Sequence, residues 1–488
     1  MIFLYIVLAL IALLLAVLVI RAILCKTKAR QLRPEKENVS PEKCEEYAKR
    51  LAQMIRCKTI SDSDSYDDTE FAKLRETMKT LFPLVHERLE KLTFGNDCWM
   101  YRLEGKDTTR NMMVMSHHDV VAATGEWEHE PFSGEIVDGK IWGRGTVDTK
   151  TPLFAEFSAL EELLAEGYVP PCNLWIGSSH NEEIAGDGVP KALEYFEQNG
   201  ITFELILDEG GAVIDAPMGG IECKCAMMAI HEKGRFSVEC MASDGDAHQG
   251  LAANPETPVV RMSRFITDIN SKNRFIRRMY PEVRAMFEGL APYSVFPMRL
   301  IFANLWLFAP LLKVLIPKIN AQAASMIGTM CSFTAINGSS QSKKCAATAS
   351  LRCVNDDDFK QDLEAFKQVA EKYGITVKEA ESGNEYHRPA DFRLPQFAYV
   401  KKCIGEIFPH VGAAPFILPA GTDARHFSDI CRCVVRFAPI EIDAQQYASV
   451  HSPNENISLK AVGNAVAFYK LFLKNLSVVQ DDPNQQLS

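Results

Sequence analysis

The segment that most restricts how this chain can fold is an uncharged apolar run at residues 2–20, IFLYIVLALIALLLAVLVI. As a helix, a run of this length measures about 28 Å, close to the roughly 30 Å apolar core of a bilayer. No basic residue precedes it, and residues 21–25 (RAILC) lack the small residue expected just before a cleavage site. We therefore predict that residues 1–30 form an uncleaved transmembrane anchor with a basic flank. The alternative is a cleaved signal with a secreted product.

Basic residues follow this run and none precedes it. They are Arg21, Lys26, Lys28, Arg30 and Arg33. By the positive-inside rule, this asymmetry predicts a single-pass protein whose bulk, including any catalytic domain, lies in the cytoplasm. The 14 cysteines are scattered, without the paired spacing of a disulfide framework. We expect them to be reduced and packed, as is typical of a cytosolic environment.

The rest of the chain has the composition of a globular protein. With 47% hydrophobic and 24% charged residues, it is neither disordered nor a small disulfide-stapled chain. The net charge is −10 and no long basic block is present, so nucleic acid is not an expected partner. We predict a linker at 31–41, a catalytic domain at 42–228 and 388–475, a lid domain at 229–387 and a polar tail at 476–488.

A second very apolar stretch covers residues 295–316, VFPMRLIFANLWLFAPLLKVLI. It contains Arg299, Asn304, Pro310 and Lys313. A Lys or Arg at the centre of a bilayer costs about 2.5–3.5 kcal/mol. We therefore predict a buried or interfacial helical hairpin here rather than a second membrane span.

Short apolar runs alternate with helical patterns between residues 111 and 208. The runs 111–119 (NMMVMSHHD), 173–183 (NLWIGSSHNEE) and 203–211 (FELILDEGG) each read as a strand that ends in polar residues. Helices are expected at 150–166 and near 189–198. This alternation predicts an α/β fold with parallel strands, helices on both faces, and ligands bound at the carboxyl ends of the strands. Residues 229–387 instead predict a smaller inserted α/β unit of β-α-β-β-α type.

Acidic and imidazole side chains stand out at five places, three of which follow these strands. The places are His117-His118-Asp119, Asp148, Glu182-Glu183, Asp208-Glu209 and the loop His451-Ser452-Pro453-Asn454-Glu455. Mixed His, Asp and Glu ligands suit zinc or a similar divalent ion. The adjacent carboxylates of Glu182 and Glu183 would repel each other, whereas a cation beside one of them leaves the other free to act as a base. The pattern therefore predicts a metal-dependent active site at the strand ends.

Several motifs make the chain resemble a known family. The stretch MSHHDVV…EWEHEPFSGEIVDGKIWGRGTVDTK, with HNEEIAGDG, LDEGG, AGTDARHF and HSPNENI, is similar to the co-catalytic di-zinc hydrolases that include glutamate carboxypeptidases, aminoacylases and carboxypeptidase S. Within them the chain resembles most the carboxypeptidase S and N-acyl-amino-acid hydrolase branch. The resemblance covers roughly residues 41 to 475. It implies a zinc-exopeptidase-like mixed sheet with helices on both faces and an inserted ferredoxin-like lid domain.

The resemblance also implies a role for each motif residue. One Zn²⁺ would be held by His117 and Asp208, a second by Glu183 and His451, and Asp148 would bridge the two. Glu182 would act as general base and then as general acid. Asp119 would orient His117.

The lid and its neighbouring loop would supply the substrate contacts. By resemblance these are His248, Arg352, Gly421, Thr422 and Arg425. A guanidinium that pairs with a substrate carboxylate would explain a preference for a free carboxylate. A homodimer through the lid is a further expectation. The chain departs from the family pattern at Asn181 and Thr149, and in residues 339–345 (SSQSKKC), where the lid segment is shortened.

These observations predict a di-zinc metallohydrolase that cleaves an amide bond next to a free carboxylate. Its substrate would be a short peptide, for a carboxypeptidase or dipeptidase, or alternatively an N-acyl amino acid, for a deacylase. An alternative of another class is a non-catalytic scaffold that retains the fold. The complete set of predicted ligands together with Glu182 favours an enzyme.

Overall fold

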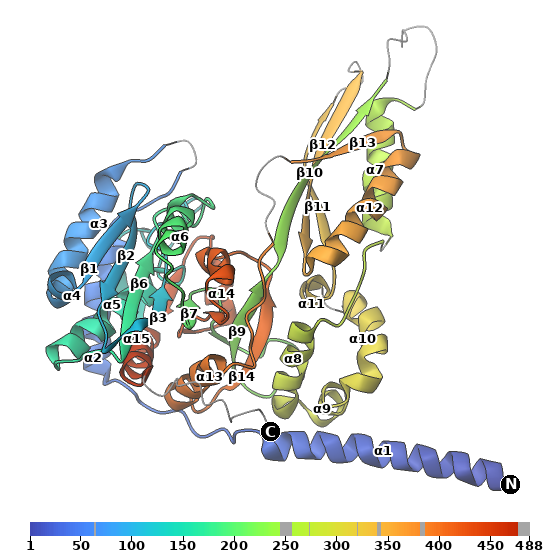
Figure 1. Ribbon diagram of the computed structural model, residues 1–488, viewed down its shortest axis with the longest axis horizontal. Helices are drawn as coiled ribbons and strands as arrows, with labels where there is room; N and C mark the ends of the chain where they lie inside the picture. The colour runs from blue at the N-terminus through green and yellow to red at the C-terminus, as the bar shows by residue number, and fades with distance from the viewer. Residues whose placement is uncertain are drawn as a thin grey trace.

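The computed structural model describes residues 1–62, 65–244, 256–272, 274–319, 321–338, 343–380 and 386–476. A large mixed sheet with helices on both faces forms the main body, and a smaller sheet projects from it (Figure 1). The helix α1 (Ile2–Lys28) extends outward from the base of the molecule. This is the α/β architecture that the sequence predicts.

The large sheet brings the strands that carry the predicted site side by side. Its order is β1-β2-β6-β3-β7-β15-β9-β8-β16, and β14 pairs with β9. The strands are β1 (Glu90–Phe94), β2 (Cys98–Leu103), β3 (Asp107–Met115), β6 (Cys172–Ser178), β7 (Leu205–Asp208), β8 (Val213–Ile214), β9 (Cys225–Glu232), β14 (Gly412–Leu418), β15 (Val434–Arg436) and β16 (Glu441–Ile442). β6, β3, β7 and β15 run parallel to one another. The carboxyl ends of β3, β6 and β7 therefore meet at one edge, where parallel sheets bind ligands.

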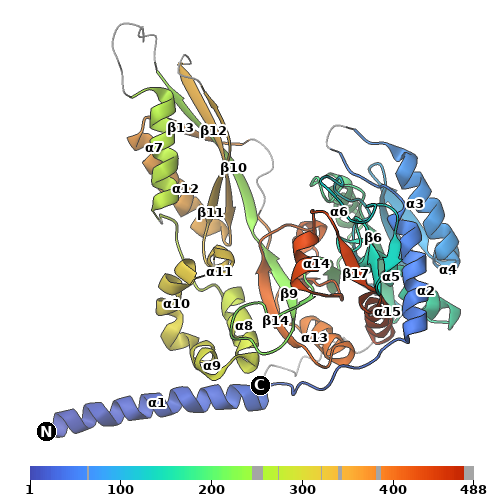
Figure 2. The same cartoon turned by 180° about the vertical axis from the view of Figure 1, so that it is seen from behind.

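Strand β3 shows why the sheet needs helices on both of its faces. Met112 and Val114 belong to the core under α5 and α15, whereas Met113 and Met115 belong to the core under α6. Successive strand residues point to opposite faces, so the apolar run at residues 112–115 of this strand has to be covered on both sides. The helices α2, α5 and α15 pack against one another over one face (Figure 2).

Two helices of the main body, α5 (Lys150–Ala165) and α6 (Gly188–Gln198), lie where the sequence predicts helices. The others are α2 (Pro41–Ile55), α3 (Asp68–Leu81), α4 (Pro83–Arg88), α13 (Pro395–Ile407), α14 (Ala444–Ser449) and α15 (Leu459–Lys474), with the 3-10 helix η2 (Asp423–Asp429). Helix α2 begins at Pro41 because the Ser40 side chain accepts a hydrogen bond from the Lys43 N–H and Pro41 occupies the first helical position.

A second sheet forms the projecting unit. Its strands are β10 (Gly234–Ser243), β11 (Met330–Gly338), β12 (Lys344–Cys353) and β13 (Ile375–Glu379), in the antiparallel order β11-β12-β10-β13. The helices α7 (Pro258–Ser271) and α12 (Asp356–Lys372) share an apolar core with this sheet. The βαββαβ succession with this strand order is ferredoxin-like, as the resemblance implies. β9 continues in the large sheet to Glu232, slightly beyond the expected boundary at 228, and the division into domains stays a prediction.

A helical segment interrupts the ferredoxin-like unit between α7 and β11. It comprises α8 (Pro281–Leu290), the 3-10 helix η1 (Ala291–Tyr293), α9 (Phe296–Phe302), α10 (Leu305–Ile319) and α11 (Ala321–Met326). The apolar stretch 295–316 thus forms α9 and most of α10, which meet at an angle of 105°. Residues of α8, α9 and α10 pack with β9 and β14 in a separate apolar core.

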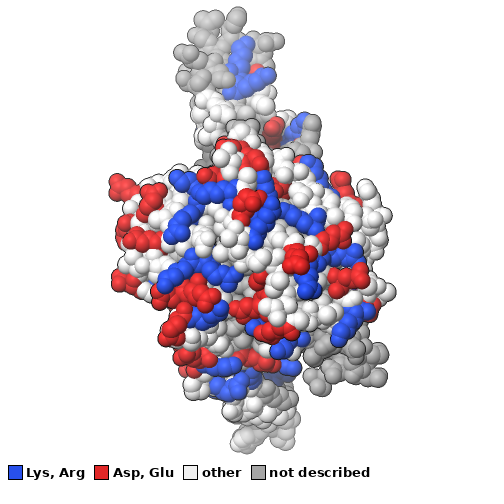
Figure 3. All heavy atoms as spheres, turned by 90° about the vertical axis from the view of Figure 1, so that its left-hand side faces the viewer, with Lys and Arg blue, Asp and Glu red and all other residues white. Residues whose placement is uncertain are grey.

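One helix of the described residues, Ile2–Thr27, is long and apolar enough to cross a membrane, or two if the bent pair α9–α10 counts as one span. Only its C-terminal part touches the rest of the protein, where Leu18 and Ala22 are buried. All 14 cysteines are unpaired. On the face that Figure 3 shows, basic and acidic side chains are interspersed rather than segregated.

A small sheet joins two distant parts of the sequence. It contains β4 (Glu135–Val137), β5 (Lys140–Trp142) and β17 (Asn456–Ser458), in the order β17-β5-β4. Pairing of Asn456 with Trp142 brings the loop that contains His451 beside the loop that follows β5. These two loops carry part of the predicted metal site.

Candidate metal centre and active site

The first predicted ligand, His117, follows strand β3 and is buried. Its Nδ1 lies 3.0 Å from the backbone oxygen of Asp119, and its Nε2 lies 3.0 Å from Asp148 Oδ1. A hydrogen bond from Nδ1–H to the carbonyl fixes the tautomer and leaves the Nε2 lone pair directed into the site. His118 is buried on the other side of the chain, stacked on Trp99, and is no part of the site.

Asp148 lies between two imidazoles. His451 Nε2 is 3.0 Å from Asp148 Oδ2, on the side opposite to His117. His451 Nε2 is also 2.9 Å from Glu183 Oε2. His451 has a φ of 57°, in the left-handed region that non-glycine residues seldom adopt, and this backbone turn directs its ring toward Asp148. The arrangement is that of a carboxylate able to bridge two cations.

The turn after β6 carries Glu182 and Glu183. The two oxygens of the buried Asp119 accept hydrogen bonds from the backbone N–H groups of Glu182, at 3.3 Å, and Glu183, at 3.2 Å. Asp119 therefore positions both glutamates as well as facing the ring of His117. Burial, together with the carboxylates of Asp423, Asp119 and Asp148, raises the pKa of Glu182 well above its ordinary value despite the opposing effect of His117.

Asp208 ends strand β7, and its oxygens are held by backbone donors. Oδ1 accepts from the Glu209 N–H at 2.8 Å, and Oδ2 accepts from the Ala424 N–H at 3.0 Å, at the start of η2. Burial, and next the carboxylate of Asp423, raise the pKa of Asp208 to about 7. Asp208 is thus oriented by its neighbours, but it does not share in the contacts that join His117, Asp148, Glu183 and His451.

The donor set fits a divalent cation. Ligand atoms of His117, Asp148 and Glu183 all lie within 4.8 Å of one another. Glu183 Oε1 is buried and has no hydrogen-bond partner among the described residues. Several carboxylates converge here, and burial raises the pKa of Glu182, Glu183 and Asp208. A bound cation would compensate this negative charge and give the unpartnered oxygen a ligand role.

A cavity of about 610 Å³ opens from this centre. Asp148, Glu182, Glu183 and His451 line it at the site. Its other walls are mainly apolar, with Ile214, Met218, Met227, Met286, Met326, Phe416, Leu418, Ile440 and Ile442 among the lining residues. The helical segment between α7 and β11 contributes to these walls through α8 and α11. A ligand that reaches the candidate centre therefore meets a long apolar surface.

The predicted substrate residues lie at different places around this cavity. Gly421 and Thr422 line it. Arg425 does not line it, but its Nη1 donates to the Thr422 carbonyl oxygen at 2.8 Å, beside Gly421. Arg352, in β12, donates to the carbonyl oxygen of Pro419 at 2.7 Å and so joins the sheet of the projecting unit to the same loop. His248 lies outside the described residues, as do residues 339–342 of the shortened lid segment.

Two buried acids near the site have roles that sequence reasoning missed. Glu455 accepts hydrogen bonds from the backbone of the loop that carries Asp148. Glu232 accepts from both the N–H and the hydroxyl of Thr422, and it pairs with Arg436. Glu455 belongs to the HSPNENI motif, which was the available signal. No local pattern marks Glu232, because its partners are almost two hundred residues away in the sequence.

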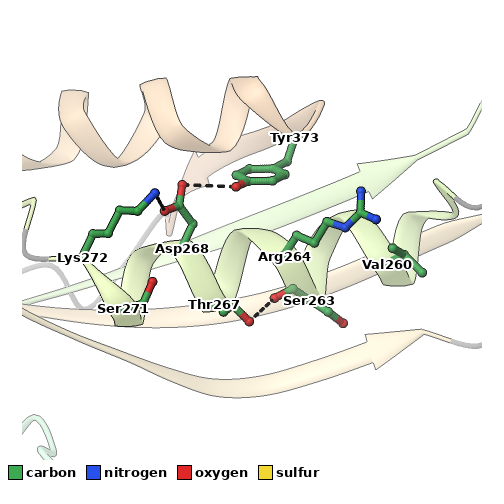
Figure 4. A pocket seen from close by; sticks show the side chains of 8 residues that line it. All are labelled: Val260, Ser263, Arg264, Thr267, Asp268, Ser271, Lys272 and Tyr373. Carbon is green, nitrogen blue, oxygen red and sulfur yellow. Dashed lines mark hydrogen bonds and ion pairs between the residues drawn. The ribbon is translucent and has the colours of Figure 1, made fainter.

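A second hollow lies on the projecting unit and carries no comparable chemistry (Figure 4). Its acid, Asp268, already pairs with Lys272 at 2.8 Å and accepts a hydrogen bond from the Tyr373 hydroxyl at 3.2 Å. Arg274 donates to both of its oxygens at 2.7 Å. These contacts tie α7 to α12 and its following turn, so the polar groups serve the fold.

Comparison with known proteins agrees with the fold and the site. A family model described as Peptidase family M20/M25/M40 matches residues 113–475, and the chain belongs to this family. It is therefore a hydrolase of the M20 peptidase class.

Among curated relatives, it is 29% identical to a probable carboxypeptidase S-like 2 from Dictyostelium discoideum, over 88% of this chain and 85% of that one. It is 28% identical to the N-fatty-acyl-amino acid synthase/hydrolase PM20D1 from Xenopus tropicalis, over 95% of this chain and 92% of that one. Among solved structures, an M20 family metallo-carboxypeptidase from Sulfolobus solfataricus is similar in fold, with a TM-score of 0.62 and 19% identity over 88% of this chain and 99% of that one.

Proposed function

We propose that this chain is a metal-dependent amide hydrolase whose preferred substrates are N-acyl amino acids with a long apolar acyl group. The observation that carries the proposal is that residues of the His and carboxylate cluster line a largely apolar cavity of about 610 Å³. Cavities of this size enclose ligands with many carbon atoms. The similarity to an N-fatty-acyl-amino acid synthase/hydrolase supports the same substrate class.

In this proposal the predicted ligands keep the roles that the family resemblance implies. His117 and Asp208 would hold one Zn²⁺, Glu183 and His451 would hold a second, and Asp148 would be shared by the two. Zinc is the proposed ion because mixed imidazole and carboxylate ligands are typical of it. Two such ions would polarise the scissile carbonyl and lower the pKa of water toward neutrality.

The protein itself would then move the proton. Glu182 lines the cavity beside Glu183, and its raised pKa suits a group that takes a proton from the attacking water and returns it to the leaving nitrogen. Asp119 holds the backbone of Glu182 and so positions this base. The products are a free carboxylic acid and an amine, with one water consumed.

Recognition of the free carboxylate is assigned to cationic groups beside the cavity. None of its lining residues is Lys or Arg. Arg425 adjoins Gly421, and Arg352 reaches the same loop from the lid. We propose that these two guanidiniums, with His248, bind the carboxylate when the lid meets the main body. A homodimer through the lid stays a prediction.

A second candidate is a carboxypeptidase or dipeptidase that acts on short peptides. It uses the same reaction and the same residues, and the 29% identity to a carboxypeptidase S-like protein favours it. The two candidates differ in the group on the acyl side of the bond. A long apolar chain would fill the part of the cavity that Met286 and Met326 line, whereas a short peptide would leave that part empty.

We further propose that α1 anchors the protein in a membrane as a single uncleaved span. The basic residues Arg21, Lys26, Arg30 and Arg33 after the apolar run place the main body in the cytoplasm under the positive-inside rule. The unpaired state of all 14 cysteines supports a reducing compartment. A cleaved signal would instead leave mature protein that begins after this helix, which N-terminal sequencing detects.

The test uses the full-length protein purified in detergent. Its metal content and its release of free amino acid are measured with an N-oleoyl amino acid, an N-acetyl amino acid and dipeptides, each with and without a chelator. We expect about two zinc ions per chain and chelator-sensitive hydrolysis, fastest with the oleoyl substrate. The Glu182→Gln variant should retain metal and lose turnover, while the exposed control Glu194→Gln in α6 should behave as the wild type.

Each other result has a defined meaning. Faster hydrolysis of dipeptides selects the second candidate. Bound metal without turnover of any substrate contradicts both candidates and supports a scaffold, as does folded protein that binds no metal.

A further inference from the structure

Helix α10 is apolar over most of its surface, and its charged residues are the half-buried Lys313 and the exposed Lys318. Its inward side is apolar, with Leu305 and Ile316 buried in the core that it shares with α8 and β14. Its outward side is largely apolar as well, because Trp306, Leu307, Leu311, Val314 and Leu315 are all exposed. We call these five residues the α10 stripe. An apolar helix surface of this kind is normally covered.

The α10 stripe begins at the contact between α1 and the rest of the protein. At the bend between α9 and α10, the buried Asn304 side chain donates to the carbonyl oxygen of Leu18 in α1 at 3.0 Å. Arg21 donates from Nε and Nη2 to the carbonyl oxygen of Ala303 at 3.3 and 3.2 Å. These contacts place the bend between α9 and α10 beside residues 18–21 of α1. These residues lie at the end of the apolar run of α1, next to its first basic residue.

The depth of α10 follows from this attachment. Residues before Leu18 project beyond the body, and α10 lies on the side of α9 toward which they project (Figures 1 and 2). Helix α10 has 15 residues and is too short to cross a bilayer alone, and the 105° bend turns α9 away from its axis. Of the charged groups of this pair, Arg299 is buried and donates to the Ser294 carbonyl at 2.7 Å, Lys313 is half-buried, and Lys318 lies exposed at the far end of α10. A membrane crossed by α1 would therefore meet α10 at its surface.

We propose that the α10 stripe is a second membrane contact, inserted into the interface of the bilayer that α1 crosses. The occupant is the lipid leaflet on the side of the catalytic body, since the stripe is continuous with the part of α1 that this leaflet surrounds. Trp306 suits this depth, because indole rings favour the membrane interface. The inference rests on the anchor assigned under the proposed function, and it adds a surface that the anchor alone does not require.

This contact bears on the route of the substrate. The segment that carries the α10 stripe continues into α11, where Met326 lines the cavity, and it begins with α8, where Met286 does so. The same inserted segment thus lies against lipid on one side and lines the cavity on the other. An N-acyl amino acid with a long chain partitions into a leaflet, so its source lies beside this segment.

The experiment places full-length protein in phosphatidylcholine vesicles with or without dibrominated acyl chains and records tryptophan emission. The chain has five tryptophans, of which Trp306 is the one in the α10 stripe. Its contribution is the difference between the wild type and Trp306→Phe, a conservative change. We expect this contribution to be blue-shifted and largely quenched by the brominated lipid. A Trp306 signal that the bromines do not quench overturns the proposal, including the case in which a second copy of the chain shields it.

A matched pair of variants separates the stripe from the anchor. Val314→Glu places a charge in the stripe, and Val169→Glu places one at an equally exposed valine between α5 and β6 (56% and 54% exposed). Both variants should remain in the membrane after alkaline carbonate extraction, because α1 is intact. Quenching of Trp306 should fall in Val314→Glu and persist in Val169→Glu, and equal quenching in the two overturns the proposal. Quenching does not depend on turnover, so failure of the proposed hydrolase activity leaves a separate, distinguishable result.

Discussion

The side chain of Glu455 and the backbone of Asp148 are joined by a hydrogen bond in which the Asp148 N–H donates to Glu455 Oε1 at 3.1 Å. The same carboxylate accepts from the N–H groups of Val147, at 2.7 Å, and Gly145, at 3.0 Å, and it pairs with Arg144 at 2.5 Å. Glu455 is fully buried. One side chain in the loop after His451 thus holds the loop that presents the candidate bridging carboxylate, so the two loops cannot move independently.

Changing Glu455 to Gln should weaken metal binding without unfolding the protein. The amide replaces one acceptor oxygen by an NH₂ group, which then faces N–H donors of the Asp148 loop. Loss of a group that orients a ligand typically costs 10- to 100-fold in metal affinity. We expect a loss of about this size for zinc, measured by competition with a chromophoric chelator. The circular dichroism spectrum should match that of the wild type, and unchanged affinity in the variant would exclude this positioning role.

The Glu182→Gln variant tests the proton-transfer step by itself. General acid–base groups typically contribute about 10²- to 10⁴-fold to rate. We expect kcat to fall by this order while zinc content and KM change little, because Glu182 is not among the proposed ligands. Steady-state kinetics and metal analysis of one preparation give all three values. Turnover at the wild-type rate would show that another group moves the proton.

Metal removal should lower thermal stability as well as activity. A ligand that binds only the folded state, at about 100 times its Kd, adds roughly 2.7 kcal/mol to the free energy of unfolding. We expect the melting temperature of chelator-treated protein to rise when zinc is restored. This rise should be much smaller in His451→Ala, whose ring contacts Asp148 and Glu183, and unchanged in His129→Ala, whose ring contacts Glu135 outside the site. An equal rise in both variants would mean that zinc stabilises the protein elsewhere.

The sequence was most informative where a simple geometric rule connects pattern to place. His117, Glu183 and Asp208 follow three apolar runs, and parallel strands bring their carboxyl ends to one edge. The fold class follows from the same alternation. Helix α5 was equally accessible, because the sequence at residues 150–166 predicts a helix and the structure has one at Lys150–Ala165.

Other features could not be predicted because burial is not visible in a short pattern. Glu232 looks like an ordinary surface acid, and the motif that contains Glu455 does not show that this carboxylate holds distant backbone N–H groups. Helix α10 shows the reverse difficulty, since it is apolar over most of its surface and its sequence does not reveal which face is exposed. Strand β9 continues past the expected boundary because Met228 and Ile230 lie in the core of the large sheet, a contact between segments far apart in sequence.

Lys233 should make stability depend on pH. It separates β9 from β10, and its Nζ donates to the carbonyl oxygens of Ser325, at 2.6 Å, and Gly328, at 2.9 Å. Burial lowers its pKa to about 7, so in the unfolded chain it binds its proton more tightly than in the fold. Between about pH 7 and the ordinary lysine value of 10.5, the unfolded state therefore holds more protons, and stability from this group rises with pH. Below this window Lys233 is charged in both the folded and the unfolded state, so the full cost of burying its charge lowers the free energy of unfolding.

The measurement compares the melting temperatures of the wild type and Lys233→Met across this window. Methionine has no titration here, so effects of other groups cancel in the difference. The loss of the two hydrogen bonds lowers the melting temperature of the variant by an amount that changes little with pH. We expect the wild type to gain stability relative to the variant as the pH rises from about 7. If the wild type gained no stability relative to the variant, or lost stability relative to it, as the pH rises, a depressed lysine pKa would be contradicted.

The size of the apolar cavity should decide between the two substrate classes. Met326 of α11 lines this cavity and is not one of the candidate ligands, and Met326→Trp fills part of the cavity. If the acyl chain occupies this region, kcat/KM for an N-oleoyl amino acid should fall by at least about tenfold. A mismatch of a single methylene group in an apolar pocket changes kcat/KM by about 10- to 200-fold. Hydrolysis of an N-acetyl amino acid should be unchanged, because its acyl group ends near Glu182.

Met279→Trp is the matched control, since Met279 packs against the same core as Met326 but does not line the cavity. Equal loss for both substrates would mean that the larger side chain disturbs the site rather than a chain-binding region, and no loss for either would place the acyl group elsewhere and favour a peptide substrate.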